Sequence, residues 1–209
     1  MDVATAKAEL VPGKDVSYLG RCIDTLLQHD CDDTSVLPLL LPFLGQDLLA
    51  NKVIDYGIEP GVDITDRYFA LWEPFARAKA ALLIATIAEK CSALPDDMTE
   101  IIDRLLVMIK GTEDIELSFS FLALSNIGTK KPELILPHFN DLCKIANRLV
   151  TIATNPTKAF SLFHSTPFKT EIYGSYLDFC LIKGLFDNPA NVQSLVASGL
   201  PFSLVNIAN

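Results

Sequence analysis

The feature that most limits how this sequence can fold is a repeated helical segment. Residues 75–90 (FARAKAALLIATIAEK) and 116–130 (ELSFSFLALSNIGTK) superpose without a gap, so that Lys90 aligns with Lys130 at a spacing of 40 residues. Each copy has an apolar face that a single helix cannot bury. Copies at a fixed spacing therefore predict units that stack on one another.

A third copy, residues 173–189 (YGSYLDFCLIKGLFDNP), follows the second after about 57–58 residues, with Pro189 aligned to Pro132. We interpret the extra length as an insertion at about residues 151–170. Large apolar groups in an insertion either fold back onto the helices or form a docking patch. The groups concerned are Phe160, Phe163 and Phe168.

Helical periodicity covers most of the remaining chain. The stretches YLGRCIDTLLQH and MTEIIDRLLVMI each place their apolar residues on one helical face. Proline and glycine, as in Pro95 and Pro189, separate these stretches. No sustained alternation of polar and apolar residues lies between hairpin turns, so strands are not expected. The sequence predicts an all-α protein.

Composition narrows the class of protein. Half of the residues are apolar and 21% are charged, which is typical of a folded globular chain. The net charge is −9, most of it in the first 110 residues, and no basic stripe is present. We therefore expect no nucleic-acid binding, and the acidic half favours a partner with a basic surface.

Two further patterns bear on location. The longest apolar stretch, VLPLLLPFLG, is about half of the roughly 20 residues that cross a bilayer, so no membrane span is expected. Five cysteines are scattered singly without a CxxC pair. That usage is typical of reduced thiols, and we predict a cytoplasmic protein, with a nuclear location as the alternative.

Two segments resemble armadillo repeats. SFLALSNIGTKKPELI (120–135) resembles the third helix of a repeat running into the next unit. NPANVQSLVASGLPFSLVNIA (188–208) resembles the following first and second helices, with Gly199-Leu200-Pro201 at the sharp turn between them. The resemblance covers about residues 96–209 and is weaker over residues 16–95. Another helical solenoid and an irregular helical bundle are the alternatives.

The resemblance implies a right-handed armadillo-like α-solenoid of about four to five repeats. Residues 1–15 are expected to be a flexible N-terminal segment, and residues 16–209 a single helical domain. Asn209 falls at the end of a second helix, where the third helix of the unit should begin. We therefore expect the chain to be a fragment of a longer solenoid, truncated at its C-terminus; an unusual cap at this end is the alternative.

No set of residues predicts catalysis. His29, Cys31 and Asp33 in QHDCDD are conceivable metal ligands, but zinc sites usually show two close ligand pairs and no second cluster is present. Asp63 and Asp66 lack the spacing and closing glutamate of a calcium loop. We expect no enzyme activity, no metal and no cofactor.

Candidate binding residues come from the resemblance. In many armadillo proteins an asparagine at the position of Asn126 lines the groove and binds the backbone of an extended peptide. The matching positions here are Thr86 in the preceding unit and Lys183 or Gly184 in the next. A single asparagine cannot hold a long extended peptide. We therefore expect a non-catalytic interaction module, a scaffold or regulator, that binds a folded partner on its concave surface.

Two other functions remain open. YLGRCIDTLLQHD (18–30) and YLDFCLIKGLFDNPANVQSLVASGLP (176–201) resemble segments of the armadillo-type GDP-dissociation stimulators of small GTPases. That likeness implies an acidic groove that engages the basic tail of a small GTPase and weakens nucleotide binding. Alternatively, the terminal apolar segment PFSLVNIAN stacks end-to-end on a second copy, giving a self-assembling structural protein.

Overall fold

The computed structural model describes residues 1–11, 14, 16–45, 64–111, 114–154 and 179–199. Within these ranges the chain forms helices and connecting turns and no strand, so the all-α prediction is confirmed. The elements in chain order are α1 (Val3–Glu9), α2 (Val16–Gln28), the short 3-10 helix η1 (Thr34–Val36), α3 (Leu37–Leu44), α4 (Ile64–Lys90), α5 (Thr99–Ile109), α6 (Asp114–Lys130), α7 (Pro132–Ile135), η3 (Leu136–His138), α8 (Phe139–Thr154), η4 (Leu185–Asp187) and α11 (Pro189–Ala197).

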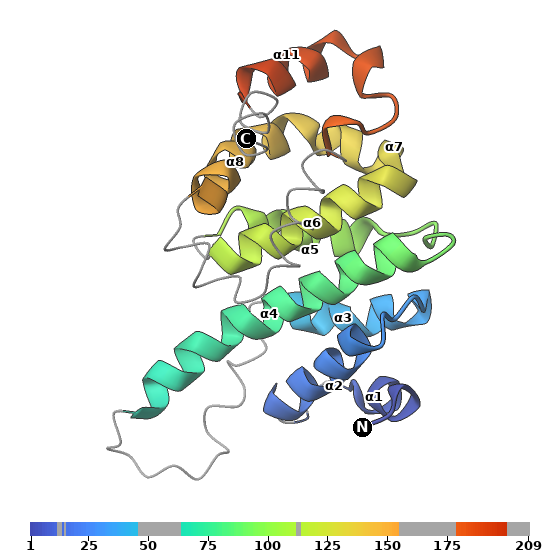
Figure 1. The fold of residues 1–209 in the computed structure, drawn as a ribbon, viewed down its shortest axis with the longest axis vertical. Coiled ribbons are helices and arrows are strands. Elements are labelled where there is room, and N and C mark those ends of the chain that lie inside the picture. Colours follow the sequence, from blue (N-terminus) through green and yellow to red (C-terminus); the bar gives the residue numbers. More distant parts are fainter. Residues whose placement is uncertain (12–13, 15, 46–63, 112–113, 155–178, 200–209) are drawn as a thin grey trace.

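The helices follow one another along the long axis of the molecule. In Figure 1, α1 and α2 lie at one end, α4 to α6 in the middle, and α8 and α11 at the other end. The contacts follow the same order, because α2 packs on α1 and α4, α6 packs on α4, and α11 packs on α8. Each helix therefore contacts mainly elements that are close to it in the sequence.

The helices α4 and α6 lie side by side in the same direction, in the register of the sequence repeat. Towards the start of α6, Arg77 Nε donates to Glu116 Oε1 at 2.6 Å, across 39 residues. At the helix ends, Lys130 Nζ donates to the carbonyl oxygen of Glu89 at 2.9 Å, across 41 residues. Partner positions rise together along both helices, so the helices are parallel and offset by about one repeat.

The helix α2 joins the same row. Lys79 Nζ of α4 donates to Asp24 Oδ2 at 2.7 Å, and Lys90 Nζ lies 3.9 Å from Asp30 Oδ1, just after α2 ends. Partner positions again rise together, so α2, α4 and α6 form a row of three parallel helices. A second row begins with α3 and α5, which contact each other and pack on α4 and α6 respectively.

The centre of the core is α6. Every residue from Ile115 to Gly128 is buried, and α4, α5, α7 and α8 pack around the helix. Its apolar and small residues are spread over all faces, which suits a helix enclosed on every side. Gly128 allows a close approach, because a Cβ added there would lie 2.9 Å from Ile182 Cδ1 and 3.3 Å from Ile135 Cγ1.

The third copy of the repeat contacts the second through an aromatic side chain. The ring centroid of Phe179 lies 5.0 Å from that of Phe121 and 4.6 Å from that of Phe139. Phe121 precedes Phe179 by 58 residues, so equivalent positions of the two copies meet. Of this segment the structure describes residues 179–189: Phe179 and Cys180 are helical, and a turn with Gly184 in the left-handed conformation (φ 82°) then leads into η4.

The structure describes residues 1–11 and 14 of the segment 1–15, which was expected to be flexible. They contain α1, whose first turn is capped where Asp2 Oδ1 accepts a hydrogen bond from the Thr5 N–H at 2.8 Å. Ala6 and Leu10 are buried, and α1 packs on α2. A seven-residue helix is not stable by itself in water, so these tertiary contacts hold it.

Several expectations fall outside the described residues. The helix α8 continues through Thr154, so the first four residues of the expected insertion are helical. The rest of it, with Phe160, Phe163 and Phe168, lies outside, as do Asp63 and the terminal segment 201–209.

Candidate interaction surface

Asn126 lies in the last two turns of α6 and connects it to α4. Its Nδ2 donates to the carbonyl oxygen of Ala85 at 3.0 Å, and the residue is 8% exposed. The carbonyl of Asn126 accepts from Thr129 Oγ1 at 2.8 Å. In this arrangement the Asn126 amide joins two neighbouring helices.

Thr86 follows Ala85 in α4, so the structure brings two of the three predicted binding residues to adjacent helices. Thr86 is half-buried, and its Oγ1 donates to the carbonyl oxygen of Leu82 in its own helix at 3.1 Å. The Thr86 hydroxyl thus donates its hydrogen bond within its own helix.

Lys183 lies in the turn between Cys180 and η4, and its side chain is exposed. The turn lies beside the last part of α6, because Ile182 approaches Gly128 closely. A Cβ added at Gly184, the alternative equivalent position, would lie 3.5 Å from Leu136 Cδ1. Of the predicted binding residues, Lys183 is therefore the one that the described structure leaves open to a partner.

The C-terminal ends of α2, α4 and α6 lie along one edge, which we call the helix-end edge (residues 28–33, 89–97 and 130–131). Lys130 Nζ donates to the carbonyl oxygens of Glu89 and Cys91, and Lys131 Nζ donates to Asp96 Oδ1 at 2.9 Å. These carbonyls belong to the end of α4, where backbone acceptors have no partner within a helix. The matched positions of Lys90 and Lys130 in the repeat were the sequence signal for this edge.

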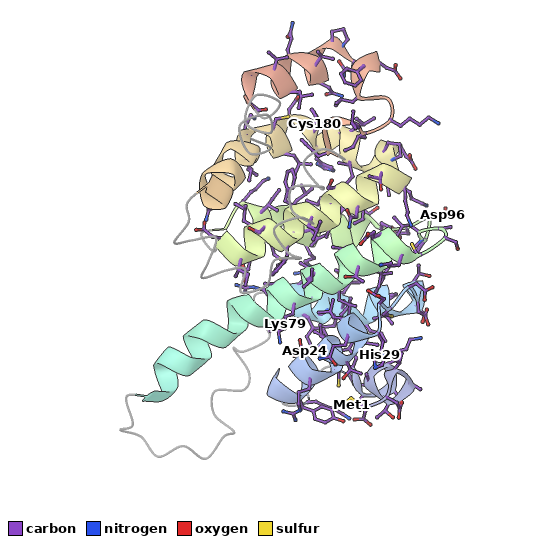
Figure 2. All side chains as sticks on the ribbon, in the orientation of Figure 1. Met1, Asp24, His29, Lys79, Asp96 and Cys180 are labelled. Carbon is purple, nitrogen blue, oxygen red and sulfur yellow. The ribbon has the colours of Figure 1, made fainter. Side chains whose placement is uncertain are left out.

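Carboxylates are exposed along the helix-end edge, and Figure 2 shows Asp96 at the margin of the molecule. Lys131 donates a hydrogen bond to Asp96 and lowers the pKa of its carboxyl below the usual 3.8. The ends of three parallel helices add partial negative charge to the same edge. The exposed acids here are Asp30, Asp32, Glu89, Asp96 and Asp97.

The three residues considered as metal ligands differ in exposure and in their hydrogen bonds. His29 is exposed, Cys31 is buried, and the Asp33 carboxylate binds Lys7 and the N–H of Ser35. The hydrogen bond from the Lys7 ammonium lowers the pKa of Asp33 to about 2, with a smaller contribution from the hydrogen bonds of Ser35. In the part of the chain that the structure describes, no three His, Cys, Asp or Glu side chains are grouped to hold a metal ion.

Two thiols near the end of the stack have raised pKa values. Burial raises the pKa of Cys143 to about 12 and that of Cys180 to about 11. Few thiolates form at neutral pH under these conditions, so neither side chain is a strong nucleophile.

Exposed apolar side chains around η4 and α11 were not anticipated from the sequence. Leu181 is 70% exposed, Phe186 63% and Val196 56%. Leu181 directly follows the helix end at Cys180, Phe186 lies in η4 after the left-handed Gly184, and Val196 lies near the end of α11.

Comparison with known proteins gives no relative from which a role could be transferred. No protein-family profile, no curated protein and no solved structure matches this chain. None of the helices that the structure describes combines the length and apolar character needed to cross a bilayer.

Proposed function

We propose that this chain is an armadillo-like α-solenoid that binds another protein and carries out no chemistry of its own. The observation that supports it most is the parallel row of α2, α4 and α6, in which α4 and α6 are offset by the 40-residue sequence spacing. Helices that stack at their sequence period build extended surfaces suited to protein partners. In this proposal α3 and α5 belong to the second layer of a right-handed superhelix of about four to five repeats.

The proposed partner contact runs along the equivalent positions Thr86, Asn126 and Lys183. Lys183 supplies the exposed charge, while Asn126 keeps α6 fixed against α4 through the Ala85 carbonyl. Asn126 would therefore affect binding mainly by fixing the position of α6 against α4, and not by contacting the partner. Such a division of roles is common at interfaces, where few side chains carry most of the binding energy.

Affinity capture with the immobilised intact chain tests the proposal, using quantitative mass spectrometry to identify bound proteins. Lys183→Glu reverses an exposed charge and leaves the core unchanged. We propose that a carboxylate of the partner faces Lys183, so one captured protein should lose about tenfold in affinity, because charge reversal at an interface costs on the order of 1–2 kcal/mol. Isothermal titration with that purified protein then gives the affinity.

Lys144→Glu is the matched control, since Lys144 is an exposed lysine on α8 paired with Asp141. It should leave the affinity unchanged. A captured protein whose affinity responds equally to both reversals would remove Lys183 from the site. Capture of no protein above the level of a heat-unfolded sample would contradict the interaction function itself.

Regulation of a small GTPase is a second candidate, favoured by the acidic helix-end edge. A basic tail would bind there through charge complementarity, which speeds association and weakens with salt. The chain would then shift the GTPase towards a state that holds nucleotide weakly, without supplying a reacting group.

Release of labelled GDP from a panel of small GTPases tests this candidate. We expect accelerated release from a member with a basic tail, reduced by Asp32→Lys on the helix-end edge. Asp103→Lys, an exposed site in the middle of α5, is the control and should have no effect. Unchanged release across the whole panel excludes the candidate.

A further inference from the structure

We draw no further inference here: the strongest candidate, the exposed apolar side chains Leu181, Phe186 and Val196 around η4 and α11, carries nothing because no contact in the described part of the structure shows what covers them.

Discussion

Two glycines within helices report how tightly their surroundings are packed. Among the described residues, a Cβ at Gly20 in α2 would meet no atom of a neighbouring element within 4 Å, whereas one at Gly128 in α6 would lie 2.9 Å from Ile182 Cδ1. Alanine is favoured over glycine inside a helix by about 1 kcal/mol. Gly20→Ala should therefore raise the free energy of unfolding by about 0.5–1 kcal/mol.

At Gly128 the same helical gain is offset by displacement of Ile182 and Ile135. Gly128→Ala should therefore be neutral or destabilising, by up to about 1–3 kcal/mol. Urea unfolding followed by circular dichroism measures both variants. Equal stabilisation by the two substitutions would contradict the close packing described for α6.

Asp33 ties the stability of the folded chain to pH at the acid end. Hydrogen bonds from Lys7, and then from Ser35, lower the pKa of Asp33 from 3.8 to about 2 in the folded state. The folded carboxylate thus binds a proton more weakly than the unfolded one. Its contribution is complete above about pH 4 and is lost as the pH falls towards 2.

Asp33→Asn should therefore lower the free energy of unfolding at pH 6, by about 0.5–1 kcal/mol because both side chains of the pair are partly exposed. The gap from the unsubstituted chain should narrow between pH 4 and pH 2. Asp32→Asn makes the same charge change at an exposed neighbour and serves as the control. A gap that stays constant over this range would mean that the Lys7 contact does not form.

Among the elements, α4 depends on α6 for its C-terminal end. Lys130 donates to the carbonyl oxygens of Glu89 and Cys91, and its charge faces the negative end of the α4 dipole. Lys130→Met keeps a side chain of similar length without the charge. We expect it to lower the free energy of unfolding by about 1–2 kcal/mol and to speed amide exchange near the end of α4.

Lys90→Met is the matched comparison, because Lys90 occupies the same position one repeat earlier. Its Nζ lies 3.9 Å from the exposed Asp30 carboxylate, a surface pair whose loss should cost less than about 0.5 kcal/mol. Equal losses for the two variants, measured by urea unfolding, would show that the carbonyl contacts of Lys130 add nothing.

Helix type and helix pairing followed from the sequence more readily than helix ends did. Matching residues 75–90 to 116–130 identified the two helices that lie side by side, because an apolar repeat has to be buried against its own kind. The helix α1 was missed because seven residues give too short a pattern, and its stability comes from packing on α2. The helix end at Cys180 was not predicted, because the apolar pattern of residues 173–189 continues past the turn that contains the left-handed Gly184.

The candidate site was harder to predict from the sequence, because it depends on how helices pack on one another. Hydrophobic periodicity predicts one buried and one exposed face for a helix. Because α6 is buried on all sides, this signal could not show that Asn126 would be covered. The buried Asn126 amide donates to a carbonyl 41 residues earlier. Such a contact depends on the register between helices, which local sequence patterns do not encode.

For the molecule as a whole, the matched register has a consequence for its evolutionary history. Arg77, Asn126 and Lys130 each find a partner about 40 residues away, on the neighbouring parallel helix. An in-frame duplication of the α6 unit would supply a new asparagine and a new lysine, each opposite a backbone carbonyl of the old α6. The Arg77–Glu116 pair would not be copied, because the residue of α6 that matches Arg77 is Leu117. The new helix would meet the old one as α6 now meets α4. A gene encoding this arrangement can therefore lengthen by duplicating a repeat unit, because each new unit would reuse the helix contacts of the old one.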